Sequence, residues 1–120
     1  EDRLDETLIE YDIDDVISND VADIAICKPM VLGGPDRTIE VARTARAAEI
    51  EPVVSTTFDA AVARTAPVHI SAAIGDVRPC GLAPGDRLQK DLCATPQGLC
   101  SGNATVPQMA GLGLSEVPNP

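Results

Sequence analysis

Aromatic side chains are scarce in this sequence, which contains no tryptophan and only Tyr11 and Phe58 as the other large rings. Aromatic residues usually contribute much of the apolar area of a core, so this core must be built from Ile, Val, Leu and Ala. Hydrophobic residues still make up 44% of the 120 residues, enough for one domain with a packed core. This composition favours packed layers of strands and helices.

Long apolar runs are also missing. A membrane-spanning helix needs about 20 mostly apolar residues, and no stretch of this sequence approaches that length. No basic-then-apolar leader opens the chain at Glu1. We therefore expect a cytoplasmic protein without a membrane partner. The absence of an initiator methionine and the ending VPNP suggest a piece of a larger protein.

Positive charge is in short supply. Lysine and arginine together number 9 against 19 acidic residues, which gives a net charge of −10. A strongly negative protein is a poor partner for a phosphate backbone, so we expect no nucleic-acid binding. The balance fits the solvated acidic surface of a protein from a halophilic organism.

The cysteine and histidine content does not suggest a zinc site. Cys27, Cys80, Cys93 and Cys100 form no CxxC pair, and His69 is the single histidine. Cys27 lies inside an apolar run and is expected in the core. Cys93 and Cys100 flank a loop rich in Pro and Gly and could bridge under oxidation, but free thiols are the rule in a reducing compartment.

Four short segments have strand character and recur at similar intervals. They are RLDET ending near Asp5, ADIAICK ending at Lys28, EPVVST ending near Ser55, and RPCGLA around Gly81. The runs IAIC and PVV are continuously apolar, as expected for strands covered on both faces.

Helical patterns separate these segments. Residues 12–21 open on Asp12 with Asp15 three positions later, a variant of the capping box. Residues 35–50 begin with Pro35 and place one face at helical spacing: Thr38, Val41, Ala42, Ala45 and Ala48. Residues 58–74 form a third pattern, which Pro67 is expected to split into two pieces. Asp59 is expected to cap its start.

Strand segments that recur at similar intervals, with a helical pattern between each pair, indicate parallel βα units. An eight-unit barrel takes about 250 residues, so this chain would supply the last three to four units of an α/β barrel. Residues 1–92 are expected to form this partial barrel. Residues 93–120 are richer in Pro, Gly and small polar residues, and only NATVPQ among them looks like a strand. We expect them to form a tail that leaves the layers.

Ligands of parallel βα sheets collect at the carboxyl ends of the strands. A carboxylate at one strand end and an ammonium at the next can form an acid/base centre, and hydroxyl groups on a third can orient a substrate. The polar or flexible residues at the predicted strand ends are Asp5, Glu6, Lys28, Ser55, Thr56, Thr57 and Gly81. Each also has a structural alternative, because Asp5 could cap a helix and Lys28 could extend into solvent.

The motifs LDET, DIAICKPMVLGG, EPVVSTTFD, CGLAPGDRL and TVPQMAGLGL occur in an order that resembles one known family. They are similar to strands five to eight and the C-terminal tail of the enolase superfamily, in its muconate cycloisomerase and mandelate racemase-type branch. The best match is to o-succinylbenzoate synthases, including haloarchaeal ones. The resemblance covers nearly the whole chain. It implies a capping domain, on which the tail would pack, and a first half of the barrel, both upstream.

The resemblance also implies roles for individual residues. Asp5 would be one of three carboxylates that hold Mg²⁺, for which Mn²⁺ can substitute, and Glu6 would stand beside it. Lys28 would act as an acid/base or as a cation that stabilises an enolate. Ser55, Thr56, Thr57 and Gly81 would contact a small carboxylate substrate. The loop Gly33–Gly34 would be a structural turn near the site.

The implied function is a lyase that forms o-succinylbenzoate by dehydration in menaquinone synthesis. A muconate cycloisomerase or racemase of the same superfamily is the close alternative, and a Schiff-base aldolase using Lys28 is a more distant one. The other metal carboxylates and the lysine pair of strand two are absent from this chain. One carboxylate does not make a magnesium site, so the chain alone should be inactive. It could be a gene remnant or a split subunit that docks onto a missing half, and a homo-oligomer is a further expectation.

Overall fold

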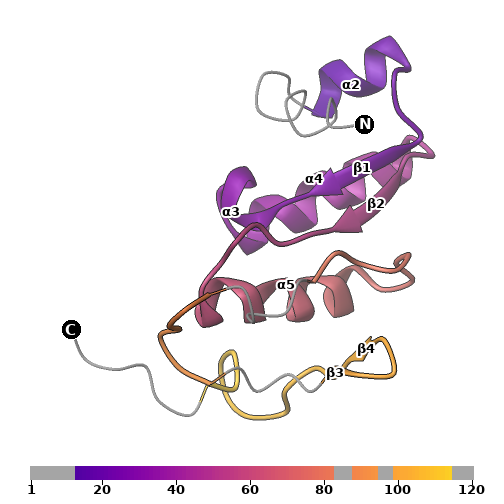
Figure 1. Ribbon diagram of the computed structural model, residues 1–120. Helices are drawn as coiled ribbons and strands as arrows, with labels where there is room; N and C mark the ends of the chain where they lie inside the picture. Colours follow the sequence, from indigo (N-terminus) through magenta and orange to yellow (C-terminus); the bar gives the residue numbers. More distant parts are fainter. Residues whose placement is uncertain (1–12, 83–87, 95–98, 115–120) are drawn as a thin grey trace.

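The computed structural model describes residues 13–82, 88–94 and 99–114. Figure 1 shows the elements in chain order. They are α2 (Ile13–Asn19), β1 (Ile24–Cys27), α3 (Pro29–Leu32), α4 (Pro35–Ala47), β2 (Glu51–Val54), α5 (Ala61–Ile74), β3 (Leu99–Cys100) and β4 (Asn103–Ala104). The predicted alternation of strands and helices is confirmed across β1, α4, β2 and α5.

Strands β1 and β2 are parallel neighbours. Ile24 pairs with Glu51, and the register continues to Cys27 opposite Val54. A parallel bridge joins Ser55 to Gly81 on the other side of β2. The predicted strand RPCGLA is therefore reduced, within the described residues, to a single bridge. The predicted strand RLDET lies outside the described residues.

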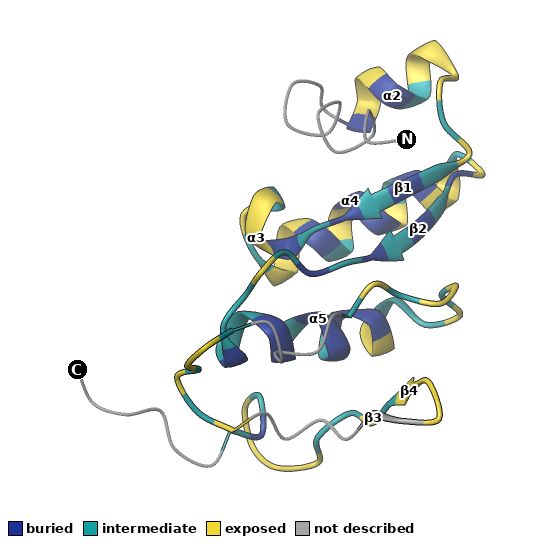
Figure 2. Cartoon of the chain, in the orientation of Figure 1, coloured by how far each residue is buried: buried dark blue, intermediate teal, exposed yellow. Residues whose placement is uncertain are grey.

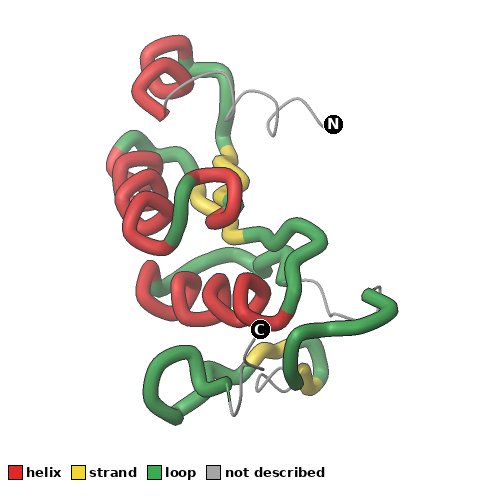
Figure 3. Tube along the Cα trace, turned by 90° about the vertical axis from the view of Figure 1, so that its left-hand side faces the viewer, coloured by secondary structure: helices red, strands yellow, loops and turns green. Residues whose placement is uncertain are grey.

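The helices cover one face of the strands. In both strands burial alternates, so that every second side chain is buried and those between are half-buried, as Figure 2 shows. Ala25 and Cys27 of β1 join residues of α2 and α4 in one core cluster. Figure 3 shows helices to one side of the two strands. The second face is only half-buried among the described residues, so the expectation that both faces are covered in a complete barrel stays a prediction.

Helix α4 fits its predicted pattern closely. It begins with Pro35 at a position where a missing N–H costs nothing, and the hydroxyl of Thr38 donates to the carbonyl of Gly34 at 2.7 Å. The buried residues are Thr38, Val41, Ala42 and Ala45. Its apolar face is therefore the one read from the sequence.

Helix α5 is one continuous helix of 14 residues although it contains Pro67. The predicted split is wrong. Proline cannot donate a backbone hydrogen bond, but two side chains add bonds nearby: the Ser71 hydroxyl donates to the Pro67 carbonyl and the Thr65 hydroxyl to the Ala61 carbonyl, each at 2.7 Å. Since the side chain of Pro67 is also fully buried, packing outweighs the lost backbone bond.

The ends of α4 and α5 are tied together by Arg46. Its guanidinium donates to the carbonyls of Ile74, Gly75 and Asp76 at 3.1, 2.9 and 3.1 Å. These carbonyls lie at the C-terminal end of α5, where helical partners run out. The contact joins the C-terminal ends of the two helices.

The described part of the tail contains a short antiparallel hairpin. Strand β4 pairs with β3, and β4 lies within the predicted NATVPQ segment. His69 of α5 contacts the tail, with its Nε2 3.3 Å from the Leu112 carbonyl. Among the described residues, no helix has the length and apolar character needed to cross a membrane.

Cys27, Cys80 and Cys93 are free thiols, and the side chain of Cys100 lies outside the described residues. Cys27 has no exposed surface, and this burial raises the pKa of its thiol to about 11. Because the thiolate is the reactive form, Cys27 should remain largely protonated and unreactive near neutral pH. The expectation of a core cysteine is confirmed.

We expect iodoacetamide at pH 8 to modify Cys27 at least about a hundredfold more slowly than the half-exposed Cys80, since a pKa near 11 leaves roughly one thiol in a thousand ionised. Mass spectrometry of tryptic peptides would measure both rates. Labelling in denaturing urea is the control and should remove the difference. Equal rates in the folded chain would contradict the buried position of Cys27.

Candidate functional site at the strand ends

Lys28 directly follows β1, at the point where the chain turns off the sheet. Its backbone is extended, with φ −106° and ψ 106°, and it is the N-cap residue of α3. Its carbonyl accepts the N–H groups of Val31 and Leu32 at 3.0 and 2.9 Å. Gly33 then ends α3 with φ 95°, a left-handed conformation that suits glycine. The Gly33–Gly34 pair is thus a structural turn, as predicted.

The register of the strands places Lys28 beside Ser55. Cys27 pairs with Val54, and the Ser55 N–H donates to the Cys27 carbonyl at 2.9 Å, so the next step of the register brings Lys28 opposite Ser55. Neighbouring strands lie about 4.8 Å apart. Since Ser55 also bridges Gly81, these three residues form one row across three adjacent chain segments.

The row lies at the carboxyl ends of the strands and on the face that the helices leave open. Side chains alternate along a strand, so Lys28 shares a face with half-buried Ile24 and Ile26, and Ser55 shares it with half-buried Glu51 and Val53. The Lys28 and Ser55 side chains therefore belong to the same face as the apolar side chains of Ile26 and Val53. The Ser55 hydroxyl also donates to the carbonyls of Thr56 and Gly81 at 3.3 and 3.4 Å. This arrangement can bind a carboxylate and can hold or move a proton at the Lys28 nitrogen.

Gly81 allows the third segment to approach Ser55 closely. The Gly81 N–H donates to the Val54 carbonyl, and its carbonyl accepts the Thr56 N–H, each at 2.9 Å. A Cβ atom on Gly81 would stand only 2.7 Å from Ser55 Oγ. Glycine suits this position because a side chain here would force the Ser55 hydroxyl to move.

Replacing Gly81 with Ala should force the Ser55 hydroxyl out of its position. The expected loss of stability is about 1 kcal/mol, the cost of an unfavourable side-chain rotation. Urea unfolding followed by circular dichroism would measure it. Adding Ser55→Ala should restore part of the loss, and independent effects of the two changes would contradict the close approach.

The next two hydroxyls are engaged inside the protein. Thr56 is 7% exposed, and its hydroxyl donates to the Gly81 carbonyl at 3.2 Å. The Thr57 N–H donates to the Asp59 carboxylate at 3.0 Å, and the Thr57 hydroxyl contacts the same carboxylate. The structure thus brings Lys28, Ser55 and Gly81 into one row, and it pairs Thr56 with Gly81 and Thr57 with Asp59. Substrate contact by these residues stays a prediction.

Asp59 does not cap α5, so that expectation is wrong. It lies one residue before the N-cap residue Ala60, and its carboxylate turns back to Thr57. The first N–H of α5, on Ala61, instead donates to the carboxylate of Asp91 at 2.7 Å. The local sequence contains no sign of this cap, because the capping residue lies 30 residues further along the chain.

Asp91 also forms an ion pair with a buried arginine. Arg64 of α5 is 5% exposed, and its guanidinium lies 2.5 Å from the Asp91 carboxylate. The hydrogen bond from Arg64, followed by that from the Ala61 N–H, holds the pKa of Asp91 below its ordinary value. The contribution of the pair to stability is therefore complete above the ordinary carboxyl pKa of about 3.9 and is lost as pH falls through the lowered value.

One sequence signal could have revealed Arg64. It lies at helical spacing between Ala61 and Val68 on a face whose other members are buried, and a buried arginine requires a partner. The partner itself could not be read from the sequence.

The metal-binding part of the prediction cannot be located. Asp5 and Glu6 lie outside the described residues. Among residues 13–82, 88–94 and 99–114, no group of three or more histidine, cysteine or acidic side chains is placed to hold a metal ion. Magnesium needs about six oxygen ligands, so the described residues do not by themselves fit that ion.

The parallel strands, the helices on one face and the polar row at the strand ends define an α/β-barrel segment of a class that binds ligands at the carboxyl ends of its strands. The chain belongs to the enolase C-terminal domain-like family, whose family model matches residues 5–116. The predicted fold, the C-terminal part of a TIM-type barrel, is thereby confirmed. No curated protein matches the sequence.

Solved structures of the same fold include two kinds of enzyme. The muconate lactonizing enzyme from Pseudomonas putida matches with a TM-score of 0.80 and 22% identity over 89% of this chain and 30% of that chain. An N-succinyl Arg/Lys racemase from Bacillus cereus matches with a TM-score of 0.70 and 23% identity over 88% and 28%. The chain therefore spans less than a third of the length of these structures.

Proposed function

We propose that this chain is the C-terminal barrel region of a magnesium-dependent lyase of the enolase superfamily that forms o-succinylbenzoate by dehydration, a step of menaquinone synthesis. The observation that carries the proposal is the row at the strand ends, where Lys28 lies beside Ser55 on the open face. The ordered motifs around these residues support the choice of this synthase within the superfamily.

In the proposed reaction a proton next to the substrate carboxylate is removed and a hydroxyl group leaves as water. The Lys28 ammonium would stabilise the negative charge that develops on the enolate, or its amine would take the proton. Ser55 would orient the carboxylate, and the apolar floor of Ile26 and Val53 would exclude water from the reacting carbon. A bound magnesium ion would supply positive charge to the carboxylate oxygens. Asp5 would be one of its ligands, and the others would come from outside this chain.

A cycloisomerase or racemase function is the second candidate. Solved neighbours of both kinds share the fold of this chain, and both reactions can use a strand-end lysine next to a carboxylate. The proposed reactions differ in what happens to the enolate after it has formed and not in how it forms. The row at the strand ends could therefore act in any of them.

The remaining partners are proposed on the same basis. An N-terminal capping domain and half-barrel would cover the open face, and the tail beyond residue 92 would pack on the capping domain. The net charge of −10 supports an acidic surface suited to high salt and no nucleic-acid partner, and a cytoplasmic site of action is proposed with them. A polypeptide that lacks the N-terminal half of the barrel would only dock onto that half and would not catalyse by itself.

The test uses the native polypeptide that carries this sequence. It is incubated with the hydrated precursor of o-succinylbenzoate, with a muconate and with an N-succinyl amino acid, each with Mg²⁺ and with EDTA. Formation of o-succinylbenzoate that EDTA stops is the expected result. Turnover of only the muconate or the N-succinyl amino acid would replace the synthase with the second candidate. No turnover after addition of a separately produced N-terminal half would favour a docking remnant.

A further inference from the structure

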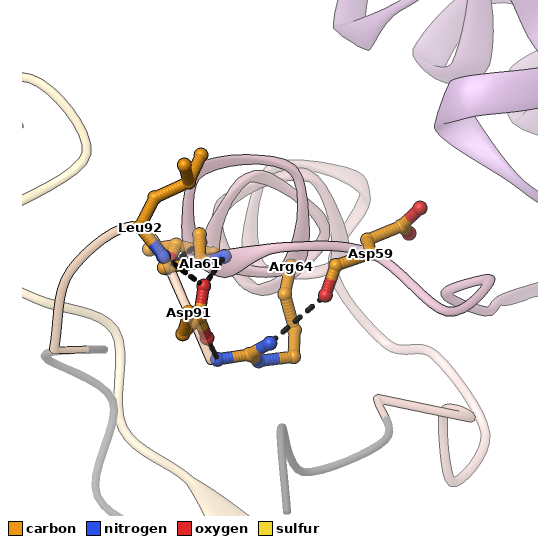
Figure 4. Close-up of polar contacts among 6 residues, drawn as sticks. Asp59, Ala61, Arg64, Asp91 and Leu92 are labelled. Carbon is orange, nitrogen blue, oxygen red and sulfur yellow. Dashed lines mark hydrogen bonds and ion pairs between the residues drawn. The ribbon is translucent and has the colours of Figure 1, made fainter. Parts of the chain in front are cut away.

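The loop that follows β2 is held by one buried arginine. Figure 4 shows the Arg64 side chain between two partners. One guanidinium nitrogen donates to the Asp59 carbonyl at 2.9 Å, and another lies 2.5 Å from the Asp91 carboxylate. Arg64 therefore joins the loop before α5 to a segment 27 residues later in the chain.

Asp59 connects Arg64 to the residues at the end of β2. Its carbonyl accepts from Arg64, while its carboxylate accepts the Thr57 N–H at 3.0 Å and contacts the Thr57 hydroxyl. Thr57 stands two residues after Ser55 of the strand-end row. The position of residues 57–59 in this loop thus depends on where the Arg64 guanidinium lies, whereas Ser55 and Thr56 are held by backbone bonds to Cys27 and Gly81.

Asp91 fixes the guanidinium in turn. One carboxylate oxygen accepts the N–H groups of Ala61 and Leu92, each at 2.7 Å, and the other oxygen receives Arg64. The aspartate is therefore anchored to the start of α5 and to its own segment. A charged pair held in this way has a defined geometry, unlike a mobile pair on the surface.

We propose that Arg64 is a positioning residue for the substrate pocket, holding the loop at residues 57–59 in place with Asp91 as its anchor. This inference rests on the proposed function in one respect, namely that the loop lines the pocket for the substrate carboxylate. Arginine is needed because its planar fork reaches a carbonyl and a carboxylate at once, whereas the single ammonium of a lysine cannot reproduce that fork.

Arg64→Lys and Asp91→Asn in the native polypeptide test the proposal. The matched control is Arg37→Gln, which breaks the ion pair of Arg37 with Glu40 on α4, where the side chains are 43% and 64% exposed. Hydrogen exchange of the Thr57 amide needs no substrate. KM and kcat for the dehydration substrate are measured alongside it.

Arg64→Lys should speed exchange of the Thr57 amide about tenfold, as expected when a charge-assisted bond that holds the loop is lost. It should raise KM by a similar factor and change kcat less. Amides of β1 and α4 should exchange as before, and Arg37→Gln should change none of these quantities. Asp91→Asn keeps the size of the side chain and should give the same pattern, which covers the case in which Arg64→Lys does not fold.

Two outcomes separate the possible failures. If either folded variant lowers the unfolding temperature but leaves Thr57 exchange and KM unchanged, Arg64 serves stability alone and the positioning role is wrong. If Thr57 exchange speeds up as expected while the unmodified protein does not turn over the dehydration substrate, the proposed function fails and the role of Arg64 in holding the loop stands.

Discussion

Replacing Lys28 with Ala should lower the rate of dehydration by about 10²–10⁴-fold, the usual contribution of a positioned acid/base side chain. Lys28 lies at the end of β1 beside Ser55, so its loss removes the cationic nitrogen from the strand-end row. Because this nitrogen is proposed to act on charge that develops during the reaction, kcat should fall more than substrate affinity. Steady-state kinetics of the native polypeptide with its proposed substrate would measure both.

Lys90→Ala is the matched control, since Lys90 is the other lysine of the chain and is exposed. It should leave kcat and KM unchanged. Circular dichroism of both variants should match the unmodified protein, because neither side chain lies in the core. A Lys28→Ala protein that retains full kcat would remove Lys28 from the mechanism and with it the main support for the proposed function.

Lys28 also shows what the sequence could reveal of the site. An apolar run that ends in a charged residue before a proline predicts a strand with the charge at its end, and the structure places Lys28 there. The neighbouring strand β2 could be predicted from its own apolar run, PVV. Its parallel pairing with β1 could be predicted from the spacing between the strand segments. These features are local or periodic, so each could be read from a short window of residues.

The contacts that the sequence did not reveal are long-range. Asp91 caps α5 from 30 residues away, and Arg46 binds carbonyls 28 to 30 residues along the chain. No local pattern specifies such partners, because they depend on how the elements pack. The predicted break of α5 at Pro67 was wrong for the same reason. The local tendency of proline to break a helix was overcome by its burial among residues that a short sequence window does not contain.

The open face of the sheet connects the fold to the proposed function. Ile26 and Val53 are half-buried on this face, while Cys27 and Val54 are fully buried against the helices. In a closed barrel the open face would be the interior and would be filled by side chains from all strands. The two faces of one strand should therefore respond differently to the same substitution, and the difference should depend on what covers the open face.

Val54→Asp should unfold or nearly unfold the 120-residue chain, whereas Val53→Asp should not. Val54 has no exposed surface, and an unpaired carboxylate there is expected to cost more than about 4 kcal/mol, a large part of the 5–15 kcal/mol that stabilises a typical domain. Val53 is half-buried on the open face, so the same change should cost only about 1–2 kcal/mol of lost apolar burial and strand preference. Far-UV circular dichroism in urea suits a chain without tryptophan.

The same pair of variants, made in the native polypeptide, tests whether the open face becomes a barrel interior. If additional strands cover that face, Val53→Asp buries a charge there, and its cost should rise towards that of Val54→Asp. A cost for Val53→Asp that stays small in the native polypeptide would mean that the face remains open, and a strand-end row above an open face would not exclude water as the proposed reaction requires. Equal costs for the two variants in the 120-residue chain would contradict the assignment of the faces itself.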